Sequence, residues 1–298
     1  MASATSISRR TILAAAVAAG AGARAQSLKF DLTSPGGQRD SFLRLAFSTA
    51  ESTLWYWYTG VVDLAAPGEP IAPLIGVDTL IRRRIEPQRD ASVHVTSWEA
   101  NYFHPIGGAA PLHMLRHARL ERAVRPYHWR EGPTTFVFSD RSPRVLGSDI
   151  LPASDTPFAM RWQQAAGRIW TTREIYAAPR HPLPLAAWPL ESSGERLTFN
   201  SVSTYTGLVA DMARDVPNVP CSFNYQAIMP WFPWLMLGQR PGHLVWRANG
   251  SKLATLADVP AEVRAAFAVV HPSILEDVPW TQPTGLWQGY MNARTPAR

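Results

Sequence analysis

The chain has 298 residues, of which 46% are hydrophobic and 17% are charged, and its formal net charge is +6. These apolar side chains suffice for a large buried core, and because the basic residues form no long run we expect no nucleic-acid partner. Cys221 is the only cysteine, which excludes an internal disulfide.

The N-terminal residues predict an export signal. Arg9 and Arg10 precede a short run rich in alanine and valine, and a small-x-small cleavage pattern ends at Ala25. We interpret residues 1–25 as a signal peptide read by the twin-arginine translocase, so that the mature protein begins near Gln26 and is periplasmic or secreted. The apolar run is far shorter than the roughly 20 residues that cross a bilayer, so we expect no stable membrane span.

Beyond this leader, short runs alternate apolar and polar residues, which is the period of a half-buried strand. Turn signals rich in proline and glycine separate most of them. The pattern predicts a single, mainly β domain over residues 26–298, either an antiparallel lipocalin-like barrel or a two-sheet β-structure. The predicted strands cover residues 42–47, 54–63, 73–84, 92–99, 114–124, 134–139, 144–150, 158–163, 168–177 and 196–204.

Few helices are predicted, and they lie toward the C-terminus. Residues 259–270 have proline in the first turn and apolar residues at helical spacing, and residues 204–214 form a second candidate. Prolines cluster in residues 179–189 and 217–241. Proline at this density favours long rigid loops, which can cover one end of the β-structure.

Several reaction classes lack their motifs. The sequence contains no glycine-rich nucleotide-binding motif, no Walker A run, no serine nucleophile elbow and no His-Glu-x-x-His zinc motif. Its eight histidines show no metal-ligand spacing beside carboxylates. We therefore expect neither a nucleotide cofactor nor a bound metal.

An aromatic strand gives the first positive signal. Side chains alternate along a strand, so Trp55 and Trp57 share one face while Tyr56 and Tyr58 share the other. Both faces then require burial. Either the strand is core between two layers, or one aromatic pair lines an apolar cavity with tyrosine hydroxyls as its polar anchors.

Three titratable residues are candidates for proton transfer: Glu99, His128 and Glu174. Glu99 ends an apolar strand, where burial raises a carboxyl pKa unless an arginine pairs with it. His128 lies among aromatic residues and is the best single candidate, although a hydrogen bond to a loop would also explain it. Glu174 shares a strand face with Tyr176 and other polar and aromatic residues, which suits a ligand-facing wall as well as exposed cross-strand pairs.

The segment Pro230 to Leu253 combines three tryptophans with prolines and glycines. We expect a rigid loop followed by a strand, with Trp231 and Trp234 in a cavity wall and Arg240 and His243 at its polar edge. Lys252 reads as a surface charge. The predicted ligand-binding residues are Trp57, Tyr58, Tyr102, Trp129, Tyr176, Trp231, Trp234, Arg240 and His243.

The same segment resembles the C-terminal signature of domain of unknown function 1838 (DUF1838), a family of bacterial and fungal proteins. Other segments follow the family's order throughout the mature chain, although residues 116–119 replace an expected asparagine-proline turn. The resemblance implies one exported domain and supplies no activity, cofactor or catalytic residue. The segments that carry it are the lead-in with Asp31, residues 57–62, 99–102, 128–133 with Phe136, 231–238, 241–244, 247–253, 287–290 and 294–296.

Three functions remain open on these grounds. The first is a lyase or isomerase that needs no nucleotide cofactor and uses acid and base residues on a small hydrophobic or aromatic molecule. The second is a lipocalin-like carrier of such a molecule without catalysis. The third is a scaffold whose tryptophans are all core. The recurrence of titratable groups beside aromatic strands favours the enzyme over the carrier.

Overall fold

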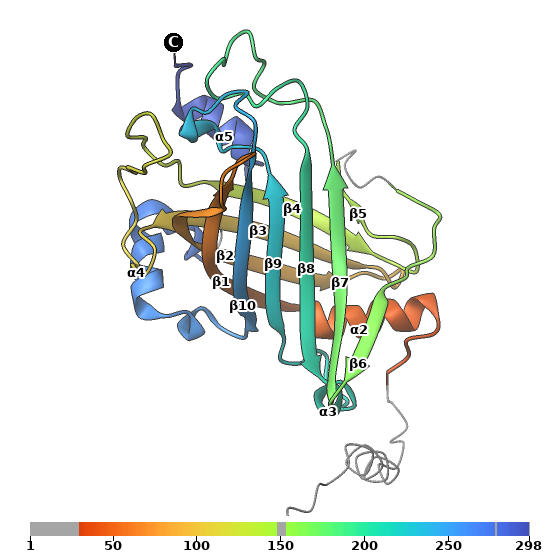
Figure 1. The fold of residues 1–298 in the computed structure, drawn as a ribbon. Coiled ribbons are helices and arrows are strands. Elements are labelled where there is room, and N and C mark those ends of the chain that lie inside the picture. Colours follow the sequence, from red (N-terminus) through yellow and green to blue (C-terminus); the bar gives the residue numbers. More distant parts are fainter. Residues whose placement is uncertain (1–29, 148–152, 278, 298) are drawn as a thin grey trace, which may run out of the picture.

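The computed structural model describes residues 30–147, 153–277 and 279–297, so the predicted signal peptide lies outside the described residues. Its strands form one antiparallel sheet in the order β5-β4-β3-β2-β1-β10-β9-β8-β7-β6 (Figure 1). The predicted mainly β, antiparallel fold is confirmed. The strands are β1 Ser52–Ala65, β2 Ala72–Pro87, β3 Val93–His104, β4 Arg130–Phe138, β5 Arg144–Val145, β6 Arg161–Ala165, β7 Arg168–Ala177, β8 Phe199–Leu208, β9 Ser222–Met229 and β10 His243–Leu253.

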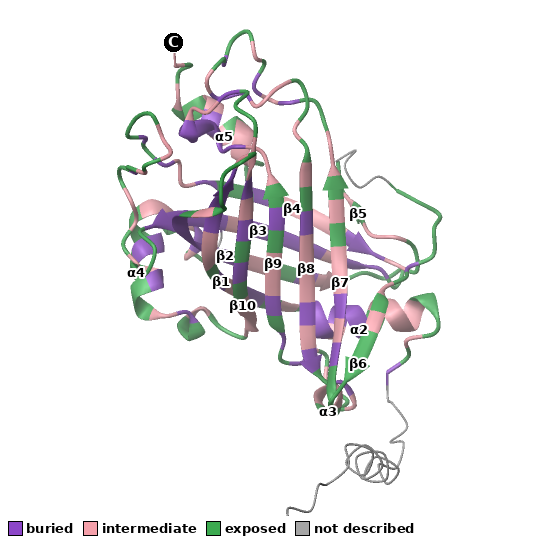
Figure 2. Cartoon of the chain, viewed as in Figure 1, coloured by how far each residue is buried: buried purple, intermediate pink, exposed green. Residues whose placement is uncertain are grey.

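The sheet folds over on itself and remains open. In Figure 1, β7 to β10 stand upright at the front while β2 to β4 run across behind them. Among the described residues, β5 and β6 pair on one side only, so they form the two edges of the sheet. We call β2 to β4 one arm of the sheet and β7 to β10 the other, and the face that the two arms enclose is the inner face. Buried residues are concentrated on β1 to β4 and on the helix between the arms (Figure 2).

That helix, α2 (Pro35–Ala46), separates the two arms at one end. The ring of Phe42 lies 5.9 Å from Phe138 on β4 and 5.4 Å from Tyr205 on β8, measured between centroids. The predicted strand at 42–47 is wrong, because these residues end the helix. Ser34 caps it by accepting a hydrogen bond from the Gly37 amide at 3.1 Å. The sequence did not predict this helix, because the two glycines after the capping serine disfavour helices.

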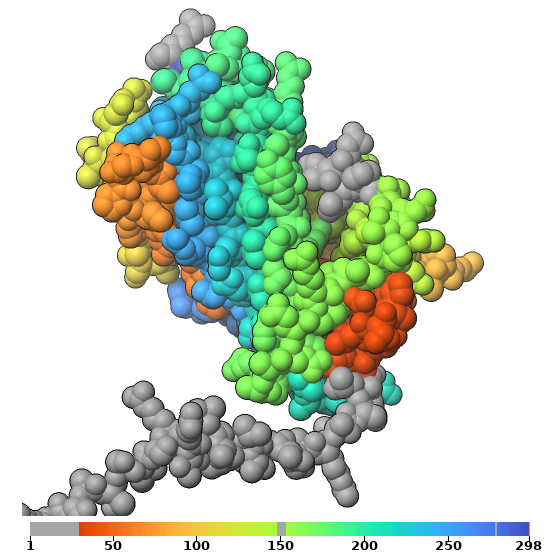
Figure 3. Space-filling view, turned by 45° about the vertical axis from the view of Figure 1, so that its right-hand side comes forward, coloured from red at the N-terminus to blue at the C-terminus, as the bar shows by residue number. Residues whose placement is uncertain are grey.

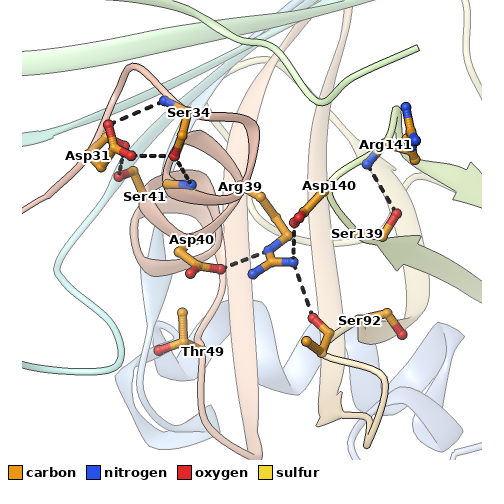
Figure 4. A network of polar contacts seen from close by, with 12 residues as sticks. Asp31, Ser34, Arg39, Asp40, Ser41, Thr49, Ser92, Ser139, Asp140 and Arg141 are labelled. Carbon is orange, nitrogen blue, oxygen red and sulfur yellow. Dashed lines mark hydrogen bonds and ion pairs between the residues drawn. The ribbon is translucent and has the colours of Figure 1, made fainter. Parts of the chain in front are cut away.

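Ion pairs attach α2 to the sheet. The Arg39 guanidinium donates to Asp40 at 2.8 Å, to Asp140 beyond β4 at 2.6 Å, and to the carbonyl of Ala91 at 3.2 Å (Figure 4). Ala91 lies in the turn between β2 and β3. One side chain therefore joins the helix to two separate connections of the sheet.

Lys252 on β10 closes the other end of α2. Its ammonium group donates to the carbonyls of Arg44, Leu45 and Phe47 at 3.1, 2.8 and 3.0 Å. These carbonyls belong to the last turn of the helix, where backbone acceptors lack partners and the dipole favours a cation. Burial lowers the pKa of Lys252 to about 8, so this residue is an internal cap rather than the surface charge that we expected.

A second layer covers the outer face of β1 to β3. Helix α4 (Ala261–Val270), which confirms the helix predicted at 259–270, packs Phe267 against Tyr102 with ring centroids 4.9 Å apart. The two other described helices are α3 (Val209–Met212) and α5 (Leu286–Ala293). Short 3-10 turns occupy Pro233–Leu235, Leu256–Asp258 and Pro272–Ile274.

Some predicted elements differ from the structure. Residues 114–124 form only an isolated bridge between Leu115 and Val124, and residues 204–214 continue β8 before the single turn of α3. Strand β9 was not predicted, because it lies within the proline cluster of residues 217–241 that we interpreted as a long rigid loop. No helix in the described part of the chain is long and apolar enough to cross a bilayer.

We predict that Lys252→Met destabilises the protein. The substitution leaves three carbonyls at the helix end without their charged donor, which costs about 2 kcal/mol. Urea denaturation should show a lower midpoint with an unchanged slope. Arg161→Met, at an exposed position on β6, is the control, and equal stability of the two variants would contradict the capping role.

Candidate functional site

The inner face of β1 carries the aromatic pair Tyr56 and Tyr58. Both rings are buried and lie 5.3 Å from Phe223 on β9. Trp55 and Trp57 point to the opposite face, where they pack in the cluster under α4. Both faces of this strand are therefore covered, as the alternation of the aromatic residues predicts.

A β-bulge in β4 places a second carboxylate on the inner face. Ser97 pairs with Thr134 and Glu99 with Glu131, so a step of two residues along β3 corresponds to a step of three residues along β4. Gly132 occupies the bulge with φ +104°, and a β-carbon there would collide with the Ser97 carbonyl. Residues 131–133, whose glycine and proline are typical of a turn, thus lie inside a strand and direct Glu131 to face Glu99.

The two glutamates differ in their surroundings. Glu99 accepts a hydrogen bond from the Asn101 amide at 3.2 Å, and Asn101 in turn accepts one from the Thr79 hydroxyl. Burial raises the pKa of Glu99. Burial, and then the charge of Glu99, raise the pKa of Glu131 to about 7, although its side chain remains accessible to solvent. A carboxyl that is enclosed by protein yet reached by water can exchange its proton near neutral pH.

Two arginines reach the same region. Arg83 on β2 lies between the rings of Phe47 and Tyr56, with its guanidinium carbon 4.8 and 4.7 Å from their centroids. Arg173 on β7 lies over Phe136 on β4, at 5.1 Å, and so crosses the space between the two arms. Burial, and the nearby charge of Arg83, lower the pKa of Arg173.

Tyrosine rings lie on the inner face beside these charged residues. Tyr225 on β9 lies 5.8 Å from both Tyr58 and Trp246. Burial, followed by the charges of Glu99 and Glu131, raises the pKa of Tyr225, so its hydroxyl keeps its proton. Figure 3 shows the molecule hollowed between the green atoms of β7 and the yellow-green segment after β4. We define the interior site as Tyr58, Arg83, Glu99, Glu131, Arg173 and Tyr225.

Of the predicted catalytic residues, only Glu99 lies in the interior site. His128 precedes β4, and its Nδ1 accepts a hydrogen bond from the Phe103 amide at 3.0 Å. Burial lowers the pKa of His128 to about 4. Glu174 is exposed on the outer face of β7, beside Tyr176, which is 70% exposed. The structure therefore does not bring these three residues together.

The predicted ligand-binding residues divide between several places. Tyr58 belongs to the interior site, and Trp129 packs in the inner core against Phe103 and Trp246. Trp57 and Tyr102 lie on the outer face, where both donate to the buried Asp78, at 2.9 and 2.8 Å.

The loop residues lie at the end of the sheet near α5. Trp234 is buried against Phe232 and lines a surface cavity of about 560 Å³ together with Tyr290 and Arg294. Trp231 donates to the Arg240 carbonyl at 2.8 Å, and the Arg240 side chain pairs with Glu69. His243 begins β10 opposite Ala65. This cavity holds no pair of facing carboxylates among its lining residues.

Sequence reasoning missed Arg83, Glu131, Arg173 and Tyr225. For Arg173, the alternation along β7 was a usable signal. Ile169 and Thr171 are buried, and Arg173 lies on the same strand face as these two residues, whereas Glu174 lies on the opposite face. In the described residues, no three histidine, cysteine or acidic side chains lie close enough to hold one metal ion.

We predict that Glu131→Gln changes the pH dependence of stability. The pKa of Glu131 is raised from 4.5 to about 7, so its contribution to stability is complete below about pH 4.5 and is lost as the pH rises through 7. Allowing for solvent screening, the variant should gain on the order of 1 kcal/mol above that range. Its Tm relative to wild type should rise by about 2–4 °C between about pH 5 and pH 8.5.

The control for this experiment is Glu51→Gln, at an exposed position before β1. Its Tm relative to wild type should be the same at both pH values. A Glu131→Gln difference that is equally flat would show that this carboxyl is fully solvated.

We predict that His128 limits stability in acid. Because its pKa is lowered from 6.5 to about 4, its contribution is complete above about pH 6.5 and is lost as the pH falls through 4. His128→Asn keeps an acceptor for the Phe103 amide but cannot titrate, so it should lose less stability between pH 7 and pH 4 than wild type. His128→Ala should be less stable than wild type near pH 7, by about 1–3 kcal/mol, and this difference should shrink toward pH 4 because alanine does not titrate either. Parallel acid sensitivity of the His128→Asn variant and the wild-type protein in circular dichroism melts would contradict this assignment.

Comparison with known proteins adds a family but no activity. No curated protein matches the chain. The family model described as "Protein of unknown function (DUF1838)" matches residues 51–282, which include the whole sheet and the interior site. The chain belongs to the DUF1838 family.

Proposed function

We propose that the protein is an acid–base enzyme, a lyase or isomerase, that acts on a small molecule with an apolar or aromatic body. The observation that carries this proposal is the pair Glu99 and Glu131, which face each other on neighbouring strands and both have raised pKa values. Carboxyl groups tuned toward neutral pH are what proton transfer requires, and their proximity couples the two titrations.

In this proposal the two glutamates have complementary roles. For a dehydration, protonated Glu131 gives its proton to a substrate hydroxyl as the carbon–oxygen bond breaks and water leaves. Ionised Glu99 takes a proton from the adjacent carbon, whose C–H electron pair becomes the new double bond. The proton then returns from Glu99 to Glu131 through solvent. An isomerisation uses the same two groups, one removing a proton and the other delivering one at a different atom.

Tyr58 and Tyr225 support the binding part of the proposal. Their rings offer apolar surface, and their hydroxyls stay protonated because burial raises both pKa values. They can therefore orient a polar group of the substrate by donating a hydrogen bond. A lipocalin-like carrier would use the same wall without turnover and is the alternative outcome of the test below.

The test begins with the ligand. Protein isolated from its own cells is analysed by native mass spectrometry, and any small molecule released on denaturation is identified and supplied as substrate. We expect Glu99→Gln and Glu131→Gln to lower kcat by about a hundredfold or more while the ligand still binds. Binding without turnover in the wild type would make the protein a carrier. A clean apo mass without uptake of 1-naphthol would refute the interior site.

Glu51→Gln is the matched control for these variants, since it removes an exposed carboxylate outside the interior site. Glu174→Gln separates the interior from the outer face of β7. If Glu174→Gln alone abolished turnover, catalysis would belong to the outer face and the paired glutamates would be structural.

We also propose that the chain is exported through the twin-arginine translocase to the periplasm or beyond. The support is the sequence around Arg9 and Arg10 and the cleavage pattern ending at Ala25. Replacing both arginines with lysine should leave uncleaved protein in the cytoplasm. Cell fractionation with N-terminal sequencing measures this, and a mature N-terminus near Gln26 in the double variant would contradict the assignment.

A further inference from the structure

Two arginines of the interior site, Arg83 and Arg173, have no acidic partner at ion-pair distance among the described residues, although the charge of Arg83 acts on the nearby Glu99 and lowers its pKa against the effect of burial. Within the described residues, ion pairs of 4.0 Å or less involve Arg39, Arg84, Arg119, Arg214, Arg240, Arg247 and His104, but neither Arg83 nor Arg173. The Nη1 atom of Arg83 is buried and has no hydrogen-bond partner within the part of the chain that the structure describes. An enclosed guanidinium without an anion is costly, because burial removes solvation that nothing replaces.

The two guanidinium groups converge on one part of the sheet. Arg83 pairs in register with Ser97, and Ser97 pairs with Thr134. Phe136, which lies under Arg173, is two residues beyond Thr134 and so shares its face. The backbone of Arg83 and the ring under Arg173 therefore lie on either side of the Ser97–Thr134 pair, and the two guanidinium groups, which come from opposite arms, are near enough for the charge of Arg83 to lower the pKa of Arg173.

The paired glutamates lie beside the same point. Glu99 and Glu131 form the inner-face pair that follows Ser97 and Thr134 along β3 and β4. A group held between the arginines would thus lie about one inner-face position, roughly 7 Å, from the two carboxyls. That separation suits a substrate whose reacting atoms are a few bonds from its anchoring group.

Aromatic rings hold the guanidinium groups of both arginines. Arg83 is held by the rings of Phe47 and Tyr56, and Arg173 by the ring of Phe136. A guanidinium that lies over aromatic rings satisfies few of its N–H donors there, because a ring offers no lone pair, and a carboxylate can accept two of the remaining donors at once. The negative charge of ionised Glu99 nearby opposes a dianion such as phosphate more than a monoanion, so a single carboxylate is the better fit.

We propose that the substrate is a small organic acid with an apolar or aromatic body, its carboxylate held between Arg83 and Arg173 and its body lying against Tyr58 and Tyr225. This inference rests on the proposed function, because it names the substrate class of the same site. It extends the site to both arms of the fold and gives the arginines an anion at ion-pair distance, which the described residues do not provide.

The test compares acids with their neutral amides on the mature protein. Isothermal titration measures binding of benzoate and benzamide, cinnamate and cinnamamide, and hexanoate and hexanamide. We expect at least one acid to bind about tenfold or more tightly than its amide. Equal affinity within every pair, or no binding by any acid, would overturn the proposal.

Variants locate the preference. Arg173→Gln should remove the acid preference, and Arg173→Lys should restore it only in part, because a point charge cannot form the two-pronged contact. Arg168→Gln, an exposed position on the same strand, is the control and should keep the wild-type preference. Arg83→Gln is a second variant with the same expected loss, compared only after its Tm shows that it is folded. An unchanged preference in folded Arg173→Gln and Arg83→Gln would place the anion elsewhere and refute the inference.

This test separates the substrate class from the chemistry. If acids are preferred and Arg173→Gln removes the preference, but the protein shows no turnover or the glutamate variants remain fully active, the catalytic proposal fails and the anion site stands. If the glutamate variants lose turnover of a neutral molecule that Arg173→Gln still binds, the catalytic proposal stands and the organic-acid inference fails.

Discussion

An open sheet must bury its inner face against something other than itself, and here helix α2 provides that surface. Phe42 fills the space between β4 and β8, where a closed barrel would bring its own strands together. The helix is fixed at its N-terminal half by Arg39 and at its C-terminal end by Lys252. The separation of the two arms depends on this helix, and the width of the interior depends on that separation.

Beyond the reach of α2, the inner face changes character. The apolar cluster around Phe42 and Phe138 gives way along β3 and β4 to serine, threonine and glutamate. Enclosing charged groups is unfavourable unless they are paired, yet among the described residues no ion pair of 4.0 Å or less involves Arg83, Arg173, Glu99 or Glu131. Conformational stability alone does not account for such an arrangement, which is why we base the proposed acid–base function and the proposed anionic ligand on it.

Much of the fold could be predicted from the sequence, because apolar and polar residues alternate with period two wherever only one face of a strand is buried. It identified most of the strands and both faces of β1 correctly. It could not tell the inner from the outer face on β7, where polar residues occupy both, and so favoured Glu174 over Arg173. The role of Glu131 was also hidden, because a one-residue bulge at Gly132 decides where that carboxyl points. Helix α2 was lost for a local reason, its glycine-rich first turn.

The bulge is held from outside the sheet. Gly132 exchanges two backbone hydrogen bonds with Thr284, at 2.9 and 3.0 Å, and its carbonyl also accepts one from the Trp280 indole at 2.7 Å. Thr284 lies just beyond the segment matched by the family model. The C-terminal segment thus acts as a brace on the strand that carries Glu131. Substitutions in this brace can therefore shift the Glu131 carboxyl relative to Glu99 while leaving the core of the sheet intact.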